Sequence, residues 1–299
     1  MTKLISINQK INFLKNKNIF VEGDKSLSIR FILLSSLSKG KCLAKNLLKS
    51  EDVISSINCI KKMGIKIRLK NSYCEVYGKG LNGYKYIKNI VLNAGNSGTT
   101  ARLLCATLID AKHDIKITGD KSLKKRDMSR IIEPLSKFGA KFRDTNKKLP
   151  LFIKGPNFLK PISYNENLGS AQCKSAVMIA ALKTKGKTQL RCLPSRNHTE
   201  IMFKKVLKIP IKIKKSGKFD LIKIDGFKEF NAFNYNIPGD ISSAAFFIVL
   251  TLLSKNSSLL IKKVNINPSR TGVIKILNKM GAKIKFFNKK DYKGETIAD

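Results

Sequence analysis

The chain has 299 residues, 42% of them hydrophobic, and its 59 basic and 20 acidic residues give a formal net charge of +39. A chain of this length is longer than one that forms a single ordinary hydrophobic core, so we expect two domains. The longest apolar run, residues 244–253, is about half of the length that spans a bilayer. The N-terminus has no apolar segment of signal-peptide length, and we therefore expect a cytoplasmic protein without a membrane partner.

The first part of the chain has the pattern strand, helix, strand, helix, strand, strand. Apolar residues at steps of three and four from Leu27 to Leu37 predict the first helix, and glycines mark the ends of both helices. The predicted elements are a strand at 19–21, a helix at 26–37, a strand at 42–46, a helix from 50–52 to Gly64, and strands at 65–69 and 74–77.

The later elements follow a similar order. We predict helices at 103–109 and 128–138, a strand at 140–142, a helix at 174–182, a strand at 188–192, helices at 200–207 and 244–253, a strand at 258–264 and a helix at 273–280. Residues 227–235 lack helical periodicity and are a candidate hinge, with an ordinary strand connection as the alternative.

Four glycine-led segments repeat along the chain. Their first residues are Gly23, Gly95, Gly169 and Gly239, which lie 72, 74 and 70 residues apart. A near-constant step indicates one supersecondary unit used repeatedly. We therefore predict an α/β protein of βαβαββ units, with three in a first domain (21–230) and one in an incomplete second domain (1–20 plus 231–299).

Each repeated segment opens a helix with small, hydroxylated or cationic residues. Helix starts carry unpaired N–H groups and a partial positive charge, so several that point one way would bind an anion. The candidate ligand-binding residues are Lys25, Ser26, Arg30, Asn96, Gly98, Arg102, Arg126, Ser170, Gln172, Ser195 and Arg196. Taken singly, such residues are as well explained by helix capping or by solvated surface charge.

The arginines differ from the other basic residues in where they occur. Only nine of the 59 basic residues are Arg, and the lysines are spread along the chain. Five of the nine lie in segments with Gly, Ser or Thr: Arg30, Arg102, Arg126, Arg196 and Arg270. Because Arg suits a bidentate grip on phosphate and carboxylate, we expect small anionic ligands and no nucleic acid. A non-catalytic basic protein that binds nucleic acid is the alternative from a different class.

The cysteines and histidines give no indication of a metal site. The six cysteines form no CxxC pair and lie in or beside apolar runs: Cys42, Cys59, Cys74, Cys105, Cys173 and Cys192. We expect them to be buried free thiols. The chain has two histidines, His113 and His198, and we expect the second at the surface or at a helix cap.

Seven segments, in order, resemble the motifs of the bacterial 5-enolpyruvylshikimate-3-phosphate synthase family. They are Gly-Asp-Lys-Ser-Leu-Ser-Ile-Arg (23–30), Gly-Asn-Ser-Gly-Thr-Thr-Ala-Arg (95–102), Thr-Gly-Asp-Lys-Ser-Leu-Lys-Lys-Arg (118–126), Ser-Ala-Gln-Cys-Lys-Ser-Ala (170–176), Pro-Ser-Arg-Asn-His-Thr-Glu (194–200), Pro-Gly-Asp-Ile-Ser-Ser-Ala-Ala-Phe-Phe (238–247) and Asn-Pro-Ser-Arg-Thr-Gly (267–272). The resemblance runs from about residue 20 to residue 299.

The resemblance implies a fold and an activity. The fold is an inside-out α/β barrel type with six βαβαββ units in two domains. The activity is transfer of the enolpyruvyl group from phosphoenolpyruvate to the 5-hydroxyl of shikimate 3-phosphate, with release of phosphate. The family needs no metal and no organic cofactor, and we expect a monomer whose partners are these two small substrates.

The resemblance also implies roles for individual residues. Lys25 would contact both substrates. The residues expected to hold shikimate 3-phosphate are Lys25, Ser26, Arg30, Ser170, Ala171, Gln172 and Ser195. Those expected at phosphoenolpyruvate are Lys25, Gly98, Arg126 and Gln172, with Asn96 and Arg102 in the same shell.

The sequence departs from the family in its last third. The two final units, which would supply the proton-transfer residues, have no counterpart before Asp299, so we expect the catalytic residues beyond it and no turnover by this chain alone. Smaller departures are Glu22 and Asp127, where the family has Pro, and Asn197, where it has Asp. The related UDP-N-acetylglucosamine enolpyruvyl transferase is a second alternative, but it would use a loop cysteine and lack the Lys-Ser…Arg opening.

Overall fold

The computed structural model describes residues 17–71 and 73–299, which divide into two compact units. Unit 2 comprises residues 23–237 and 292–295. Unit 1 comprises, among the described residues, 17–22, 238–291 and 296–299. Residues 1–16, which we assigned to the second domain, lie outside the described residues.

The division does not fall at the predicted hinge. Strand β13 (Asn234–Asn236) pairs in parallel with β2 (Lys39–Lys45), so residues 231–237 are counted with unit 2. The prediction of a hinge at 227–235 is therefore wrong, because backbone hydrogen bonds hold the end of this segment in a sheet. The division lies between Glu22 and Gly23 and between Ile237 and Pro238.

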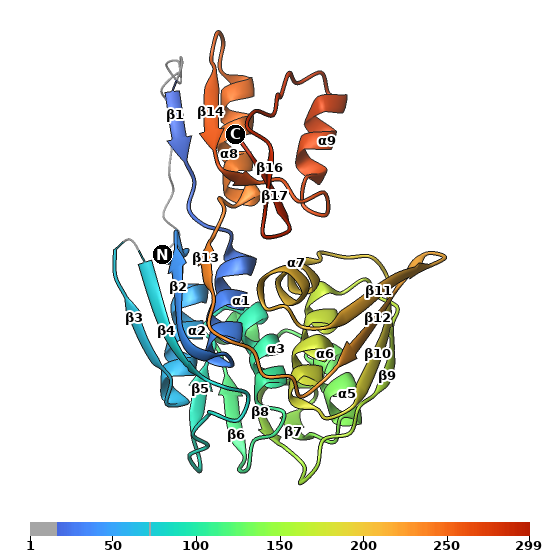
Figure 1. Cartoon of the computed structure of the whole chain (residues 1–299). Coiled ribbons are helices and arrows are strands. Elements are labelled where there is room, and N and C mark those ends of the chain that lie inside the picture. Colours follow the sequence, from blue (N-terminus) through green and yellow to red (C-terminus); the bar gives the residue numbers. More distant parts are fainter. Residues whose placement is uncertain (1–16, 72) are drawn as a thin grey trace. The chain divides into compact units, whose positions relative to one another are not determined.

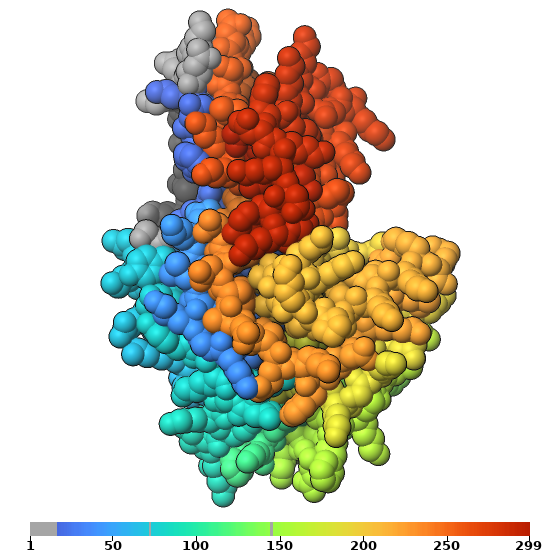
Figure 2. All heavy atoms as spheres, in the orientation of Figure 1, coloured from blue at the N-terminus to red at the C-terminus, as the bar shows by residue number. Residues whose placement is uncertain are grey.

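Unit 2 contains three four-stranded sheets that share one pairing order, with a parallel pair at one edge followed by two antiparallel pairs (Figure 1). The first is β13–β2–β4–β3, the second β5–β6–β8–β7 and the third β9–β10–β12–β11. The remaining bounds are β3 (Lys66–Leu69), β4 (Tyr73–Lys79), β5 (Val91–Asn93), β6 (Ile115–Thr118), β7 (Lys141–Thr145), β8 (Lys148–Lys154), β9 (Ser163–Glu166), β10 (Lys187–Cys192), β11 (Ile211–Ser216) and β12 (Phe219–Asp225). The cyan atoms of the first sheet and the gold atoms of the third lie on opposite sides of unit 2 (Figure 2).

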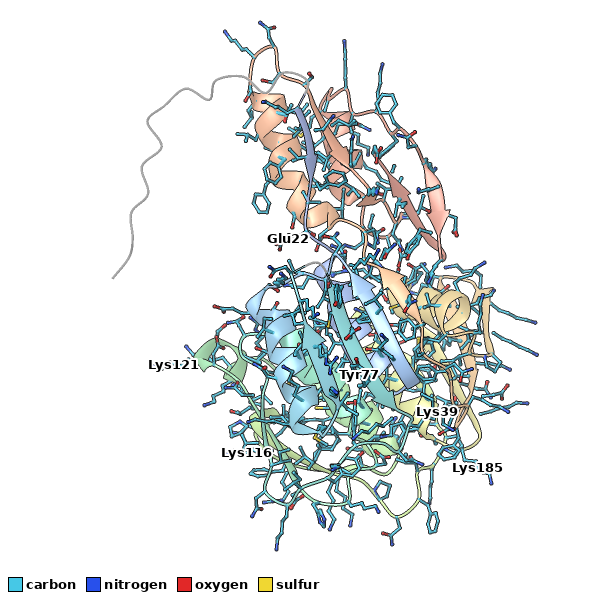
Figure 3. All side chains as sticks on the ribbon, turned by 60° about the vertical axis from the view of Figure 1, so that its left-hand side comes forward. Glu22, Lys39, Tyr77, Lys116, Lys121 and Lys185 are labelled. Atoms are coloured by element: carbon cyan, nitrogen blue, oxygen red, sulfur yellow. The ribbon has the colours of Figure 1, made fainter. Side chains whose placement is uncertain are left out.

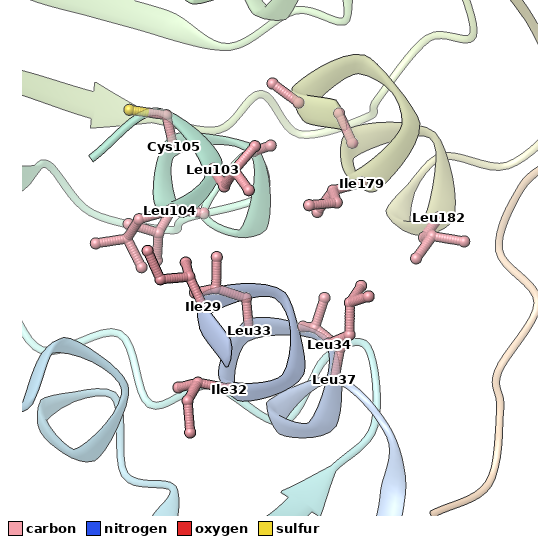
Figure 4. Close-up of a cluster of buried hydrophobic side chains, with 14 of the residues drawn as sticks. Ile29, Ile32, Leu33, Leu34, Leu37, Leu103, Leu104, Cys105, Ile179 and Leu182 are labelled. Carbon is pink, nitrogen blue, oxygen red and sulfur yellow. The ribbon is translucent and has the colours of Figure 1, made fainter. Parts of the chain in front are cut away.

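Three helices form the centre of unit 2: α1 (Lys25–Ser36), α3 (Gly98–Thr107) and α6 (Ala171–Lys183). Helix α3 packs against both α1 and α6. The side chains where they meet are apolar and fully buried, including Leu33, Leu103 and Ile179 (Figure 4). Each of these helices begins two or three residues after one of the repeated glycines, so the repeat brings three helix starts into one body.

Side-chain caps explain where these helices begin. The side chains of Asp24, Ser97 and Ser170 each accept a hydrogen bond from a backbone N–H in the first turn that follows. Helix α3 therefore starts at Gly98 rather than at the predicted residue 103, and α6 starts at Ala171 rather than at 174. The predictions were late because the small residues after each cap carry no apolar periodicity, although the cap satisfies the first free N–H groups.

The other helices of unit 2 lie outside this central group. They are α2 (Glu51–Lys62), α4 (Lys121–Lys124), α5 (Ser129–Lys137), α7 (His198–Ile201) and the π-helical turn η1 (Met202–Val206). We predicted a single α-helix at 200–207, whereas the chain forms one turn of α-helix and then π-helix. Periodicity in so short a segment does not distinguish these two states.

Unit 1 combines a parallel pair of strands with a helix that packs against one of them. Strand β1 (Lys17–Phe20) pairs in parallel with β14 (Leu259–Lys262), and helix α8 (Ile241–Leu253) packs against β14. The other elements are β15 (Val264–Asn265), α9 (Gly272–Lys279), β16 (Lys290–Tyr292) and β17 (Glu295–Ala298), of which Tyr292 and Glu295 are counted with unit 2. The predicted strand at 258–264 is broken, because Lys263 adopts a left-handed backbone conformation with φ of 55°.

The surface of unit 2 is rich in lysine. Of the lysines labelled in Figure 3, Lys39, Lys116 and Lys121 come from β2, β6 and α4, and Lys185 lies between α6 and β10. Among residues 17–71 and 73–299, no helix has the length and apolar character needed to cross a bilayer.

Candidate functional site

A cavity of about 260 Å³ lies in unit 2 where the three central helices begin. Its walls are Ser26 and Arg30 of α1, Thr99 of α3, Ser170, Ala171 and Gln172 at the start of α6, and Arg196. Five of these residues were predicted to bind shikimate 3-phosphate, and the fold brings them together from positions far apart in the sequence. Three helix N-termini and two guanidinium groups give this cavity a positive potential suited to an anion.

Arg30 is the buried cation of the cavity, with 3% of its surface exposed. Its Nε donates to Thr199 Oγ1 (2.8 Å), its Nη2 to Ser175 Oγ (2.8 Å) and its Nη1 to the carbonyl oxygen of Ser26 (3.0 Å). All three acceptors are neutral. Burial lowers the pKa of Arg30 to about 10, which still leaves the side chain protonated at neutral pH.

A second group of predicted residues adjoins the cavity at Gln172. The Gln172 carboxamide accepts from Arg102 Nη1 (2.6 Å) and donates to Thr99 Oγ1 (2.8 Å), so its orientation is fixed by one partner at each end. A Cβ at Gly98 would lie 3.1 Å from Arg126 Nη1 and 3.3 Å from Arg102 Nη1. The bare glycine therefore leaves room for two guanidinium groups beside the start of α3.

Arg126 is oriented by a short chain of hydrogen bonds. Its Nη2 donates to Asn96 Oδ1 (2.8 Å), and Asn96 Nδ2 donates to Asp120 Oδ2 (2.6 Å). The Leu123 N–H and the Asn96 amide hold the pKa of Asp120 below its ordinary value. Burial, and then the charge of Arg126, lower the pKa of Arg102. Although the charge of Asp127 partly offsets this effect, two arginines near one another favour an anionic ligand.

Two of the seven residues predicted to hold shikimate 3-phosphate do not line the cavity. Lys25 Nζ lies 2.9 Å from Asp52 Oδ2 at the start of α2. The Ser195 hydroxyl oxygen is buried and has no hydrogen-bond partner among the described residues, while its carbonyl oxygen accepts from Lys174 Nζ at 3.4 Å. The predicted contacts of these two residues with substrate are therefore not tested by the geometry of this cavity.

Several residues around the site were missed by the sequence analysis. Thr99 lines the cavity, and Ser175 and Thr199 hold Arg30. All three lie inside quoted motifs, but as small hydroxylated residues near helix starts they were indistinguishable from caps. Burial could have been suspected only from their position next to apolar runs.

His198 differs from expectation, because it is fully buried. Its Nδ1 lies 2.6 Å from Glu295 Oε1, and that carboxylate is also fully buried. Sequence reasoning missed this contact because the two residues are 97 positions apart. The six cysteines are buried and free, as predicted.

Comparison with known proteins places the chain in a family. The profile of the family described as EPSP synthase (3-phosphoshikimate 1-carboxyvinyltransferase) matches residues 11–297. The chain belongs to the EPSP synthase family. It is 42% identical over 294 residues to the 3-phosphoshikimate 1-carboxyvinyltransferase of Thermoanaerobacter sp. (strain X514), covering 97% of this chain and 67% of that protein. The corresponding protein of Ruthia magnifica is 43% identical over 282 residues, covering 93% and 63%.

The fold agrees with that of solved structures of the family. The EPSP synthase from Acinetobacter baumannii superposes with a TM-score of 0.84 at 36% identity, covering 96% of this chain and 66% of the other. A second structure of EPSP synthase from the same organism gives 0.83 at the same identity. The chain thus spans about two thirds of the length of these EPSP synthase relatives.

Proposed function

We propose that this chain provides the shikimate 3-phosphate-binding part of an enzyme that transfers the enolpyruvyl group from phosphoenolpyruvate to shikimate 3-phosphate. The observation that carries the proposal is the cavity of unit 2, in which the buried cation Arg30 meets three helix N-termini. A buried cation whose protein partners are all neutral is stabilised further by an anion. Family membership supports the same ligand, which carries a phosphate and a carboxylate.

The residue roles follow from this proposal. Ser26, Arg30, Ser170, Ala171 and Gln172 hold shikimate 3-phosphate in the cavity, and Arg196 adds a cation at its wall. Lys25 and Ser195 join them when substrate is bound. Gly98, Arg126 and Gln172 face phosphoenolpyruvate together with Lys25, and Asn96 and Arg102 support them. The hydrogen bond from Arg102 to Gln172 links the two groups of residues.

The chemistry needs this concentration of positive charge. Enolpyruvyl transfer passes through a tetrahedral adduct that bears a phosphate and a carboxylate on one carbon. Fixed guanidinium groups and helix N-termini stabilise such charge without reorganising during the reaction. The fixed carboxamide of Gln172 and the chain from Asp120 through Asn96 to Arg126 keep the donors in place before substrate arrives.

We extend the proposal to the architecture. The shared pairing order of the three sheets supports a βαβαββ unit repeated three times in unit 2, as in an inside-out α/β barrel. Unit 1 would be a counterpart with one such unit, and it leaves several apolar side chains of α8 exposed, among them Phe246 and Leu253. On this proposal the protein acts as a monomer on small substrates.

Ligand binding tests the proposal directly. We expect shikimate 3-phosphate, but not shikimate, to raise the melting temperature of the chain and to bind in isothermal titration. Arg196→Gln should weaken binding on the order of tenfold, because a hydrogen bond between charged groups is lost. Arg196 is exposed, so this variant should fold normally.

Arg143→Gln is the matched control, since Arg143 is an exposed arginine of unit 2 that pairs with Asp114 away from the cavity. It should bind shikimate 3-phosphate as the unchanged chain does. No thermal shift and no heat of binding at millimolar shikimate 3-phosphate, with salt-dependent binding to random duplex DNA, would instead favour the basic nucleic-acid-binding alternative.

A further inference from the structure

We propose that Thr199 and Ser175 are positioning residues for Arg30, and that they set the direction in which the cavity presents this cation to its ligand. The inference rests on the proposed function, because the ligand it concerns is shikimate 3-phosphate. It assigns a role to two buried hydroxyl groups that do not line the cavity themselves.

The two hydroxyl groups accept hydrogen bonds from one edge of the Arg30 guanidinium group. Thr199 Oγ1 and Ser175 Oγ accept from Nε and Nη2 of Arg30, and the two hydroxyl oxygens are 2.7 Å from each other. Both residues are fully buried. The carbonyl of Ser26 accepts from Nη1. Since an arginine has five N–H donors, one N–H remains on each terminal nitrogen, a pair suited to two oxygens of one anion.

The choice of hydroxyl groups has an electrostatic consequence. A carboxylate at either position would hold Arg30 equally well, but it would also neutralise the charge that attracts an anion. The charge of Glu200, next to Thr199, also acts on Arg30, but Glu200 is shared with a second cation, because Lys174 Nζ lies 2.5 Å from its Oε1. Neutral acceptors therefore fix the orientation of Arg30 and leave its charge to the ligand.

A buried ion pair holds the two hydroxyl groups together. Lys174 precedes Ser175 on α6, and Glu200 follows Thr199 on α7. The Lys174–Glu200 pair, with both side chains buried, ties these two helices at adjacent positions. Lys174 also donates to the Ser195 carbonyl at 3.4 Å, which anchors the segment that carries Arg196. The contacts thus join α1, α6 and α7 behind the cavity.

Removing one hydroxyl while keeping the side-chain shape tests the inference. Thr199→Val should raise the dissociation constant for shikimate 3-phosphate on the order of tenfold, because Arg30 loses a fixed partner and samples other directions. Thr199→Ser keeps the hydroxyl and should bind like the unchanged chain. Ser175→Ala is an independent second variant with the same expected direction. Titration calorimetry gives the constants, and ligand-free melting temperatures verify that each variant is folded.

Thr188→Val is the matched control, since Thr188 is a buried threonine of unit 2 whose hydroxyl has no partner among the described residues. It should leave binding unchanged. Unaltered binding by both Thr199→Val and Ser175→Ala, or equally weak binding by Thr199→Ser and Thr199→Val, would overturn the positioning role alone. Absence of binding by the unchanged chain would overturn the proposed function, and the inference with it.

Discussion

Two helices with similar starts and similar apolar character are buried to very different extents in the two units. Helices α1 and α8 both begin at a glycine-led segment with an aspartate cap, and both are apolar. Ten of the twelve residues of α1 are buried, whereas two of the thirteen residues of α8 are. In unit 2, α1, α3 and α6 pack together, while α8 packs on β14 and β15. Burial of a repeat helix thus depends on having other repeats beside it, and not on its own sequence.

The cavity follows from the same difference. In unit 2 the starts of three helices lie together, so their partial positive charges add and their small side chains line one cavity. In unit 1 Arg270 lies at the start of α8, where its Nη2 donates to Asp240 Oδ1 at 3.0 Å and to Ser242 Oγ at 2.8 Å. Arg30 has neutral partners, whereas Arg270 is paired with a carboxylate, so the two units differ in the charge they offer a ligand.

Truncating a central apolar side chain should give the largest contrast. Leu33→Ala in α1 removes a fully buried side chain and should lower the free energy of unfolding of unit 2 by about 3–5 kcal/mol. Phe246→Ala in α8, where the side chain is 79% exposed, should change the stability of unit 1 by less than about 0.5 kcal/mol. Hydrogen exchange followed by mass spectrometry measures the stability of each unit separately. Equal effects would mean that α8 is covered in solution.

Removing the cation of an ion pair should give the second-largest difference in lost stability between the two units. Lys174→Met leaves the Glu200 carboxylate buried without its cation and should cost unit 2 about 3 kcal/mol. Arg270→Met in unit 1 leaves the Asp240 carboxylate with the hydrogen bond that it accepts from the Ser242 N–H, and should cost about 1–2 kcal/mol. Urea unfolding of each variant, followed by hydrogen exchange, measures the two values. A larger loss for Arg270→Met would contradict the comparison.

Two glycines that are each the first residue of a helix give a smaller contrast. Gly98 opens α3 and Gly272 opens α9, but an added Cβ meets two guanidinium groups at Gly98 and open space at Gly272. Gly98→Ala should weaken phosphoenolpyruvate binding, measured with shikimate 3-phosphate present, on the order of fivefold, because Arg126 and Arg102 must shift. Gly272→Ala should leave binding intact. The prediction fails if both variants bind alike.

The reaction of the native thiols with a reagent measures the accessibility of unit 2 alone, because all six cysteines lie in it. Burial raises the pKa of Cys59, Cys74 and Cys105 to about 12. At pH 8 they should react with a thiol reagent at least about a hundredfold more slowly than a cysteine placed on α8 by Leu253→Cys. Raising the pH should speed the native thiols up to about pH 12, whereas the new thiol should level off near pH 8.5. Rapid labelling of native cysteines would show that unit 2 opens readily.

Much of the local structure and the family follow from the sequence alone. The spacing of apolar residues gives the bodies of the helices, and the glycine-led repeat marks the segments that open α1, α3, α6 and α8, although the predicted starts of α3, α6 and α8 were three to five residues late. These features depend on near neighbours in the chain, which a periodic pattern records directly. Ser26, Arg30, Ser170 and Gln172 were selected from these helix starts, Ala171 was implied only by the family resemblance, and all five line one cavity.

Strand partners and buried polar contacts were decided only by the tertiary structure. Strand β1 precedes α1 in the chain yet pairs with β14 in unit 1, and β13 precedes α8 yet pairs with β2 in unit 2. The partners of Arg30 on α6 and α7, and the contact of His198 with Glu295, likewise join residues about 100 or more positions apart. Such pairings depend on which surfaces meet after the chain has folded, and no local pattern of residues encodes that meeting.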